Sequence, residues 1–149
     1  MSSKYKKAAR PVDKEQMYLI ASSLGTTQDN QDIRVSTVAE TYTGGHIQVS
    51  LQRVSGGGVI QCALMMVPEG VTNPTLTTTD ANPFAQPEEY VLWGASVYLG
   101  SNSVEPVILK DRIKTMRKMK NGDALVFACR GSVATVGTVT ALVTAFFNQ

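Results

Sequence analysis

Alternation of apolar and polar residues recurs along this chain and predicts β-strands. The clearest case is 46–53, in which every second residue is apolar. Such alternation is typical of an antiparallel strand with one buried and one exposed face. The run 59–67 is almost wholly apolar and predicts a more fully buried strand. Because three glycines at 56–58 separate the two runs, they are predicted to form a hairpin.

Further strands are predicted where β-branched and aromatic residues recur between turn residues. These segments are 15–24, 33–42, 88–99, 107–120, 125–129 and 139–147. The polar stretch 25–32 is predicted to be a loop, Gly44-Gly45 a turn, and 120–123 (Lys-Asn-Gly-Asp) a hairpin-type turn. About eight or nine short strands without a predicted helix indicate an all-β fold, a single eight-stranded antiparallel jelly-roll sandwich.

The length of 149 residues predicts one domain. We expect the sandwich to cover 15–149 and a short, flexible basic arm to cover 1–14, because the arm lacks apolar periodicity. Residues 68–87 contain four prolines among Thr and Asn and are predicted to form a long surface loop.

Positive charge is concentrated in two segments. Residues 1–14 and 110–120 hold 11 of the 14 Lys and Arg residues, while the remainder of the chain carries three arginines against ten acids. This segregation favours a polyanionic partner, and we predict that the side chains of both segments contact nucleic acid. They are Lys4, Lys6, Lys7, Arg10, Lys14, Lys110, Arg112, Lys114, Arg117, Lys118 and Lys120.

The segment 110–120 has a second interpretation of equal weight. If it is a strand, its alternate positions Arg112, Lys114, Lys118 and Lys120 form one cationic face. Edge strands often carry lysine, because charge there prevents strand-to-strand aggregation. The cluster therefore indicates either a polyanion-binding surface or a protected sheet edge.

Cys62 and Cys129 lie in apolar runs without CxxC spacing, which favours buried free thiols over a disulfide. No apolar leader opens the chain, and the weakly polar run 133–147 is too short and too rich in threonine to span a bilayer. We expect a soluble protein made in a reducing compartment, with no membrane partner.

Candidate chemistry is sparse. His46 is the only histidine, so neither a zinc nor an iron site is expected, and no nucleotide-binding or hydrolase motif occurs. A thiol paired with His46 is disfavoured because both cysteines lie in apolar runs. We predict no enzymatic activity, no metal and no cofactor. Trp93 alternates with apolar residues, which favours core packing over stacking on a base.

Three segments in the second half of the chain carry a family resemblance. They are YVLWG (90–94), RKMKNGDALVF (117–127) and GTVTALVTAFF (137–147). Together they resemble coat proteins of small, circular single-stranded DNA viruses that encode a replication initiator, and coat proteins of satellite plant viruses are similar in architecture. The resemblance implies a single jelly roll, of which sixty copies form a T=1 icosahedral capsid, with the basic arm facing the genome.

In that family such a protein is a virion component that packages a single-stranded genome, and we expect DNA in preference to RNA. The resemblance also implies assembly in the nucleus or cytoplasm of a host cell, and it places 68–87 between subunits or on the outside. An alternative function is a soluble β-sandwich binding module for glycan or protein ligands. In that case Trp93 and the tyrosines would form the binding platform.

Overall fold

A computed structural model describes residues 14–56, 58–77, 90–100, 105–132 and 136–148, which form nine β-strands and no helix. The strands are β1 (Lys14–Leu24), β2 (Asp29–Val35), β3 (Glu40–Ser55), β4 (Gly58–Val67), β5 (Val91–Leu99), β6 (Val107–Ile113), β7 (Arg117–Met119), β8 (Ala124–Gly131) and β9 (Val136–Asn148). Since no helix occurs in these ranges, none of their segments is a helix able to cross a membrane.

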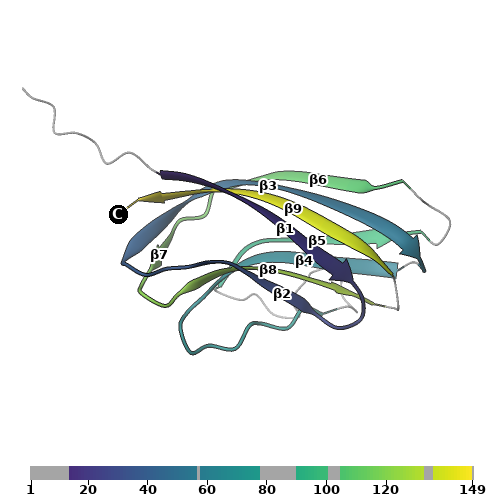
Figure 1. The fold of residues 1–149 in the computed structure, drawn as a ribbon, viewed down its shortest axis with the longest axis horizontal. Helices are drawn as coiled ribbons and strands as arrows, with labels where there is room; N and C mark the ends of the chain where they lie inside the picture. The colour runs from purple at the N-terminus through teal and green to yellow at the C-terminus, as the bar shows by residue number, and fades with distance from the viewer. Residues whose placement is uncertain (1–13, 57, 78–89, 101–104, 133–135, 149) are drawn as a thin grey trace, which may run out of the picture.

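Two antiparallel sheets pack face to face (Figure 1). Sheet A has the order β1-β9-β3-β6, and β7 pairs with β3 on the same side as β6. Sheet B has the order β2-β8-β4-β5. In this arrangement the chain crosses repeatedly between the two sheets, which is the strand order of a jelly roll. The predicted all-β jelly-roll sandwich is confirmed, with the three-residue strand β7 added to the eight main strands.

Two predicted hairpins are wrong. β3 lies in sheet A between β9 and β6, whereas β4 lies in sheet B between β8 and β5, so the two strands do not pair. Likewise, the turn at 120–123 leads from β7 in sheet A to β8 in sheet B. Short turns rich in glycine therefore connect the layers here. The residue pattern predicts that the chain turns, but not into which sheet it turns.

Three strand assignments between residues 25 and 45 also differ from prediction. β2 begins at Asp29, inside the predicted loop 25–32, because an edge strand accepts polar residues on its exposed face. The predicted strand 33–42 is interrupted at 36–39, between β2 and β3. Gly44-Gly45 lies inside β3 rather than in a turn, where the pairing with β9 shifts register at a bulge.

A buried ion pair joins the sheets at one end of the sandwich. The Arg34 guanidinium on β2 donates from Nε and Nη2 to the two carboxylate oxygens of Glu40 on β3, both at 2.8 Å. Ser36 Oγ donates to the same carboxylate at 3.0 Å, and the guanidinium lies 4.4 Å from the centroid of the Phe147 ring. The Glu40 side chain is 1% exposed and that of Arg34 27%. The hydrogen bond to this carboxylate raises the pKa of Arg34 above its ordinary value, so the guanidinium stays charged.

Tyr42 gives a prediction about pH dependence. Its ring packs edge-on against Phe147, but its buried hydroxyl has no hydrogen-bond partner among the described residues. Burial raises its pKa to about 12. Since the unfolded state ionises first, wild-type stability should fall between pH 10 and 12. We expect Tyr42→Phe to be neutral or stabilising at pH 7, and more stable than wild type by a further ~1 kcal/mol at pH 11. Urea unfolding at both pH values measures this; a variant less stable than wild type would show that the hydroxyl is satisfied.

The core confirms the predictions for Cys62, Cys129 and Trp93. Both cysteines are free and buried, and they lie opposite each other on β4 and β8. Burial raises the pKa of both thiols, that of Cys129 to about 12, so neither is a ready nucleophile. Trp93 is 9% exposed, and its Nε1 donates to Asp111 Oδ2 at 3.0 Å, linking β5 to β6.

Part of the outer face of sheet B is covered by the chain itself. Leu76, from the first part of the predicted 68–87 loop, is fully buried with Met65 and Val126. Gln28 holds this segment, since its side chain donates to Pro74 O and accepts from Leu76 N. Arg130 Nη1 also donates to Leu76 O. This part of the predicted loop therefore packs on its own sheet. The rest of the predicted loop, 78–87, lies outside the described residues.

Candidate interaction surface

The arm residues Lys4, Lys6, Lys7 and Arg10 lie outside the described residues, so their predicted contacts stay predictions. Lys14 is the first described residue. It opens β1 and pairs with Phe147 at the end of β9.

The segment 110–120 is two short strands and not one. β6 ends at Ile113 and β7 begins at Arg117. The two strands follow the same side of β3, where β6 pairs with Gly45–Leu51 and β7 with Glu40–Tyr42. The interruption at 114–116 lies beside the bulge in β3, so the edge follows the irregularity of its neighbour.

The predicted cationic face exists in part. Lys110 and Arg112 are exposed on the outer face of sheet A, opposite the exposed residues Gln48 and His46 of β3. Lys118 lies opposite Thr41, while Met119 beside it is buried. The other basic residues of the segment also lie in the described chain: Lys114 and Lys120 are exposed and Arg117 is half-buried.

Strand register places Lys14, the described residue of the first basic segment, at the same end of the sandwich as β7. Lys14 pairs with Phe147, Phe147 with Tyr42, and Tyr42 with Arg117, which makes one continuous row across sheet A. Neighbouring strands are about 4.8 Å apart, so the start of β1 is roughly 15 Å from β7. Lys14 is therefore near the basic residues of β7, although some 100 residues separate them in the sequence.

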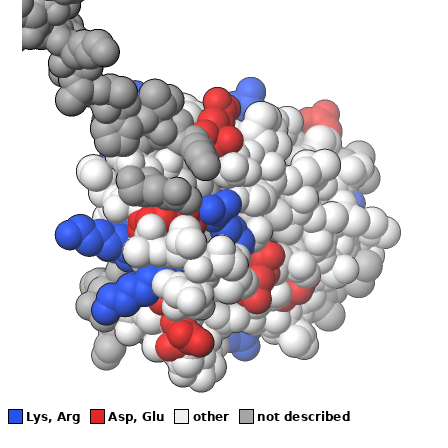
Figure 2. All heavy atoms as spheres, turned by 60° about the vertical axis from the view of Figure 1, so that its left-hand side comes forward, with Lys and Arg blue, Asp and Glu red and all other residues white. Residues whose placement is uncertain are grey.

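Acidic residues interrupt the positive surface. Figure 2 shows Lys and Arg beside Asp and Glu at the end of the sandwich that carries β7. A shallow hollow of about 420 Å³ along β3 and β6 is lined by His46, Ile47, Gln48, Lys110, Asp111 and Arg112. The carboxylate of Asp111 in this hollow accepts hydrogen bonds from Trp93 Nε1 and from the backbone N–H of Arg112. The hollow is suited to loose electrostatic contacts and not to an enclosed ligand.

The alternative interpretation of the cluster also gains a structural basis. β6 pairs only with β3, so it is an edge strand of sheet A. Its charges at 110–112 are placed where they would prevent another strand from pairing. Geometry is compatible with both interpretations, and they call for an experiment that separates them.

An exposed apolar area on β1 was not predicted from the sequence. Met17 and Leu19 on β1 are 62% and 75% exposed on the outer face of sheet A, beside the half-buried Leu142 and Phe146 of β9. Because residues 17–20 are all apolar, the sequence does not indicate which of them face solvent. The signal available was the predicted strand 15–24 itself, since alternate residues of a strand at the surface face outward.

Neither a metal centre nor a thiol–histidine pair forms in the described ranges. They contain no group of three or more His, Cys, Asp or Glu residues that could hold a metal ion. His46 is on the exposed face of sheet A, whereas Cys62 and Cys129 lie between the sheets. Of the residues proposed as a ligand platform, Trp93 is buried and bonded to Asp111, so it cannot serve there.

No protein family and no curated protein matches the sequence. Solved structures with similar folds include one from disulfide-linked pili, the endospore appendages of Bacillus, at 11% identity and a TM-score of 0.43, covering 94% of this chain and 91% of that one. A capsid chain of cyanophage Pam1 has 11% identity and a TM-score of 0.42, covering 98% and 96%. The tumour necrosis factor Eiger of S. frugiperda has 11% identity and a TM-score of 0.43, covering 90% and 92%. Likeness at this level assigns neither a family nor a function.

Proposed function

We propose that this protein is a structural subunit that assembles with copies of itself, specifically a viral coat protein whose sixty copies form a T=1 icosahedral shell around a single-stranded genome. The observation that carries the proposal is the contrast between the two sheets. On the outer face of sheet B the segment around Leu76 covers Met65 and Val126, whereas on the outer face of sheet A Met17 and Leu19 are exposed. Exposed apolar residues grouped on one sheet face are typical of a surface that contacts other molecules.

Packaging of the genome is the finer part of the proposal. The row from Lys14 to Arg117 supports it, because both basic segments would meet the same polyanion. Such contacts are to phosphates and are independent of base sequence. We infer DNA in preference to RNA from the family resemblance, and with it a place in the virion and assembly in the host nucleus or cytoplasm.

Electron microscopy and sedimentation of the purified protein test the assembly. We expect uniform round particles whose protein mass is sixty times that of the 16.0 kDa chain. A monomer at every salt concentration and pH would overturn the proposal. A monomer that binds one ligand saturably would favour the alternative binding module, although the burial of Trp93 removes the main residue of its platform.

Deletion of residues 2–10 tests the arm. We expect less co-purifying nucleic acid and an unchanged melting temperature, because the deletion removes four cations that precede β1 in the sequence. The slope of log K against log salt for a single-stranded oligonucleotide should become shallower by up to about 3, since each phosphate contact contributes about 0.7. An unchanged slope would show that the arm does not touch the nucleic acid.

A triple variant separates the two interpretations of the basic edge. Lys110→Ala, Arg112→Ala and Lys118→Ala together should weaken nucleic-acid binding and its salt dependence if the edge binds the genome. If the charges protect the edge instead, the variant should aggregate while its salt slope stays unchanged. Gln48→Ala with Gln52→Ala, on the neighbouring strand and the same face, is the neutral control.

A further inference from the structure

The long edge strands of the sandwich differ in their charge. β2 carries Asp29, Asp32 and Arg34, and β6 carries charges at 110–112. β1 has no charged residue after Glu15, although it is eleven residues long. β5 is uncharged too, but its outward-facing residues are Gly94, Ser96 and the exposed Tyr98 rather than an aliphatic row. Only β1 combines a long, uncharged edge with exposed aliphatic side chains, and such an edge is competent to pair with another strand.

The hydrogen bonds of Ser23, near the end of β1, show which backbone N–H and C=O groups of β1 point away from β9. Ser23 N–H donates to Asp29 Oδ2 at 3.4 Å, and Ser23 C=O accepts from Cys129 Sγ at 3.9 Å. Neither partner is on β9, so the backbone of Ser23 points away from β9. In an antiparallel ladder the backbone groups of alternate residues point to the same side. Those of Met17, Leu19 and Ala21 therefore face the open edge, and in the described structure no hydrogen bond to another residue occupies them.

We propose that β1 pairs antiparallel with β1 of a second copy about a two-fold axis at Leu19, joining two sheets A into one continuous sheet. This register places Leu19 opposite Leu19 and Met17 opposite Ala21. All three have open backbone groups, so the pairing forms about six inter-chain hydrogen bonds. No like charges meet, because Glu15 lies opposite Ser23. The proposal deepens the self-assembly proposed above by naming a contact, and it rests on that assembly.

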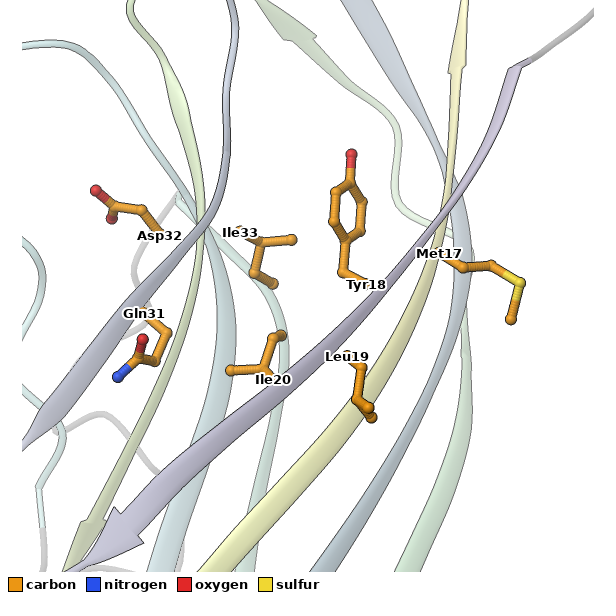
Figure 3. A pocket seen from close by; sticks show the side chains of 7 residues that line it. All are labelled: Met17, Tyr18, Leu19, Ile20, Gln31, Asp32 and Ile33. Atoms are coloured by element: carbon orange, nitrogen blue, oxygen red, sulfur yellow. The ribbon is translucent and has the colours of Figure 1, made fainter.

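A groove beside β1 provides room for the second copy's inward-facing side chains. It has a volume of about 360 Å³ and is lined by residues 17–20 of β1 and 31–33 of β2. In Figure 3, Ile20 and Ile33 lie between the two strands, whereas Met17 and Leu19 point to the other side of β1. A strand added next to β1 would direct its Tyr18 and Ile20 over this groove. The contact thus buries apolar groups on both sides of the joined sheet.

The decisive variant places charge on the two-fold axis. Leu19→Lys sets two like charges directly opposite each other in the pair. Leu142→Lys is the matched control, because Leu142 pairs with Leu19 on the same face but belongs to the interior strand β9. We expect Leu19→Lys to raise the apparent dissociation constant of the contact about tenfold or more in sedimentation velocity. Mixing it with Leu19→Glu should restore association, since only a two-fold at this residue brings position 19 opposite itself.

Amide hydrogen exchange checks the geometry. In the assembled wild type, the amides of Met17, Leu19 and Ala21 should become protected, and they should exchange rapidly in Leu19→Lys. A wild type that assembles while Leu19→Lys assembles equally well would overturn this contact and leave the shell proposal standing. Equal disruption by Leu142→Lys, or no recovery in the mixture, would also overturn it. A monomeric wild type with rapid exchange at all three amides would overturn both proposals.

Discussion

Replacing Arg34 by methionine is expected to destabilise the folded protein by about 3–5 kcal/mol, which is a large part of the stability of a domain of this size. The carboxylate of Glu40 is 1% exposed, so it would remain buried without its cation. Glu40→Gln should cost less, about 1–3 kcal/mol, because the remaining guanidinium is 27% exposed and water can reach it. Urea unfolding monitored by circular dichroism measures both values.

The double variant Arg34→Met with Glu40→Leu should recover most of the loss, because it removes both charges from a buried site. Arg112→Met is the control for the arginine substitution, as Arg112 is exposed on an edge strand, and its effect should stay within about 0.5 kcal/mol. If Arg34→Met lost as little stability as Arg112→Met, the ion pair would contribute nothing to joining the sheets.

Gly45→Ala should destabilise the protein by about 3 kcal/mol, or prevent folding. A Cβ at this position would overlap the carbonyl oxygen of Thr144 on β9. Overpacking in a core usually costs about 1–3 kcal/mol, and here the obstacle is backbone of a paired strand, which cannot rotate away. Thermal unfolding of the purified variant measures the loss.

Gly25→Ala is the matched control for this glycine. A Cβ there has no atom within 4 Å, and its backbone is not in the left-handed region. The substitution should be neutral or slightly stabilising, because alanine restricts the unfolded chain. If Gly45→Ala were as stable as Gly25→Ala, the bulge in β3 would be able to open without cost.

The strands and their burial could be predicted because alternation and apolar runs directly reflect which faces are buried. β4, β8 and β9 lie at or near their predicted positions, since each has neighbours on both sides, whereas β3 contains the predicted strand 46–53 but begins earlier, at Glu40. The connections could not be predicted in the same way. The glycines at 56–58 and the turn at 120–123 reverse the chain, but whether the next strand joins the same sheet depends on partners far away in the sequence.

The candidate surface shows the same division. The basic residues of 110–120 were evident from composition, and strand alternation predicted that Arg112 and Lys118 share a face. The strand register that places Lys14 at the same end as Arg117 could not be predicted, because it depends on pairing through β9 and β3. Exposure of Met17 and Leu19 was missed because a contiguous apolar run reads as core.

The two buried cysteines allow the opening of the sandwich to be measured by the rate of thiol modification. Cys62 and Cys129 face each other on the two central strands of sheet B, at 0% and 1% exposure. A thiol reagent can reach them only when that sheet separates from its partner, so the modification rate follows the opening of the whole sandwich. The rate therefore compares the variants of Arg34 and Gly45 under native conditions, without any denaturant. In an assembled particle, it would also report whether contacts between copies hold each sandwich closed.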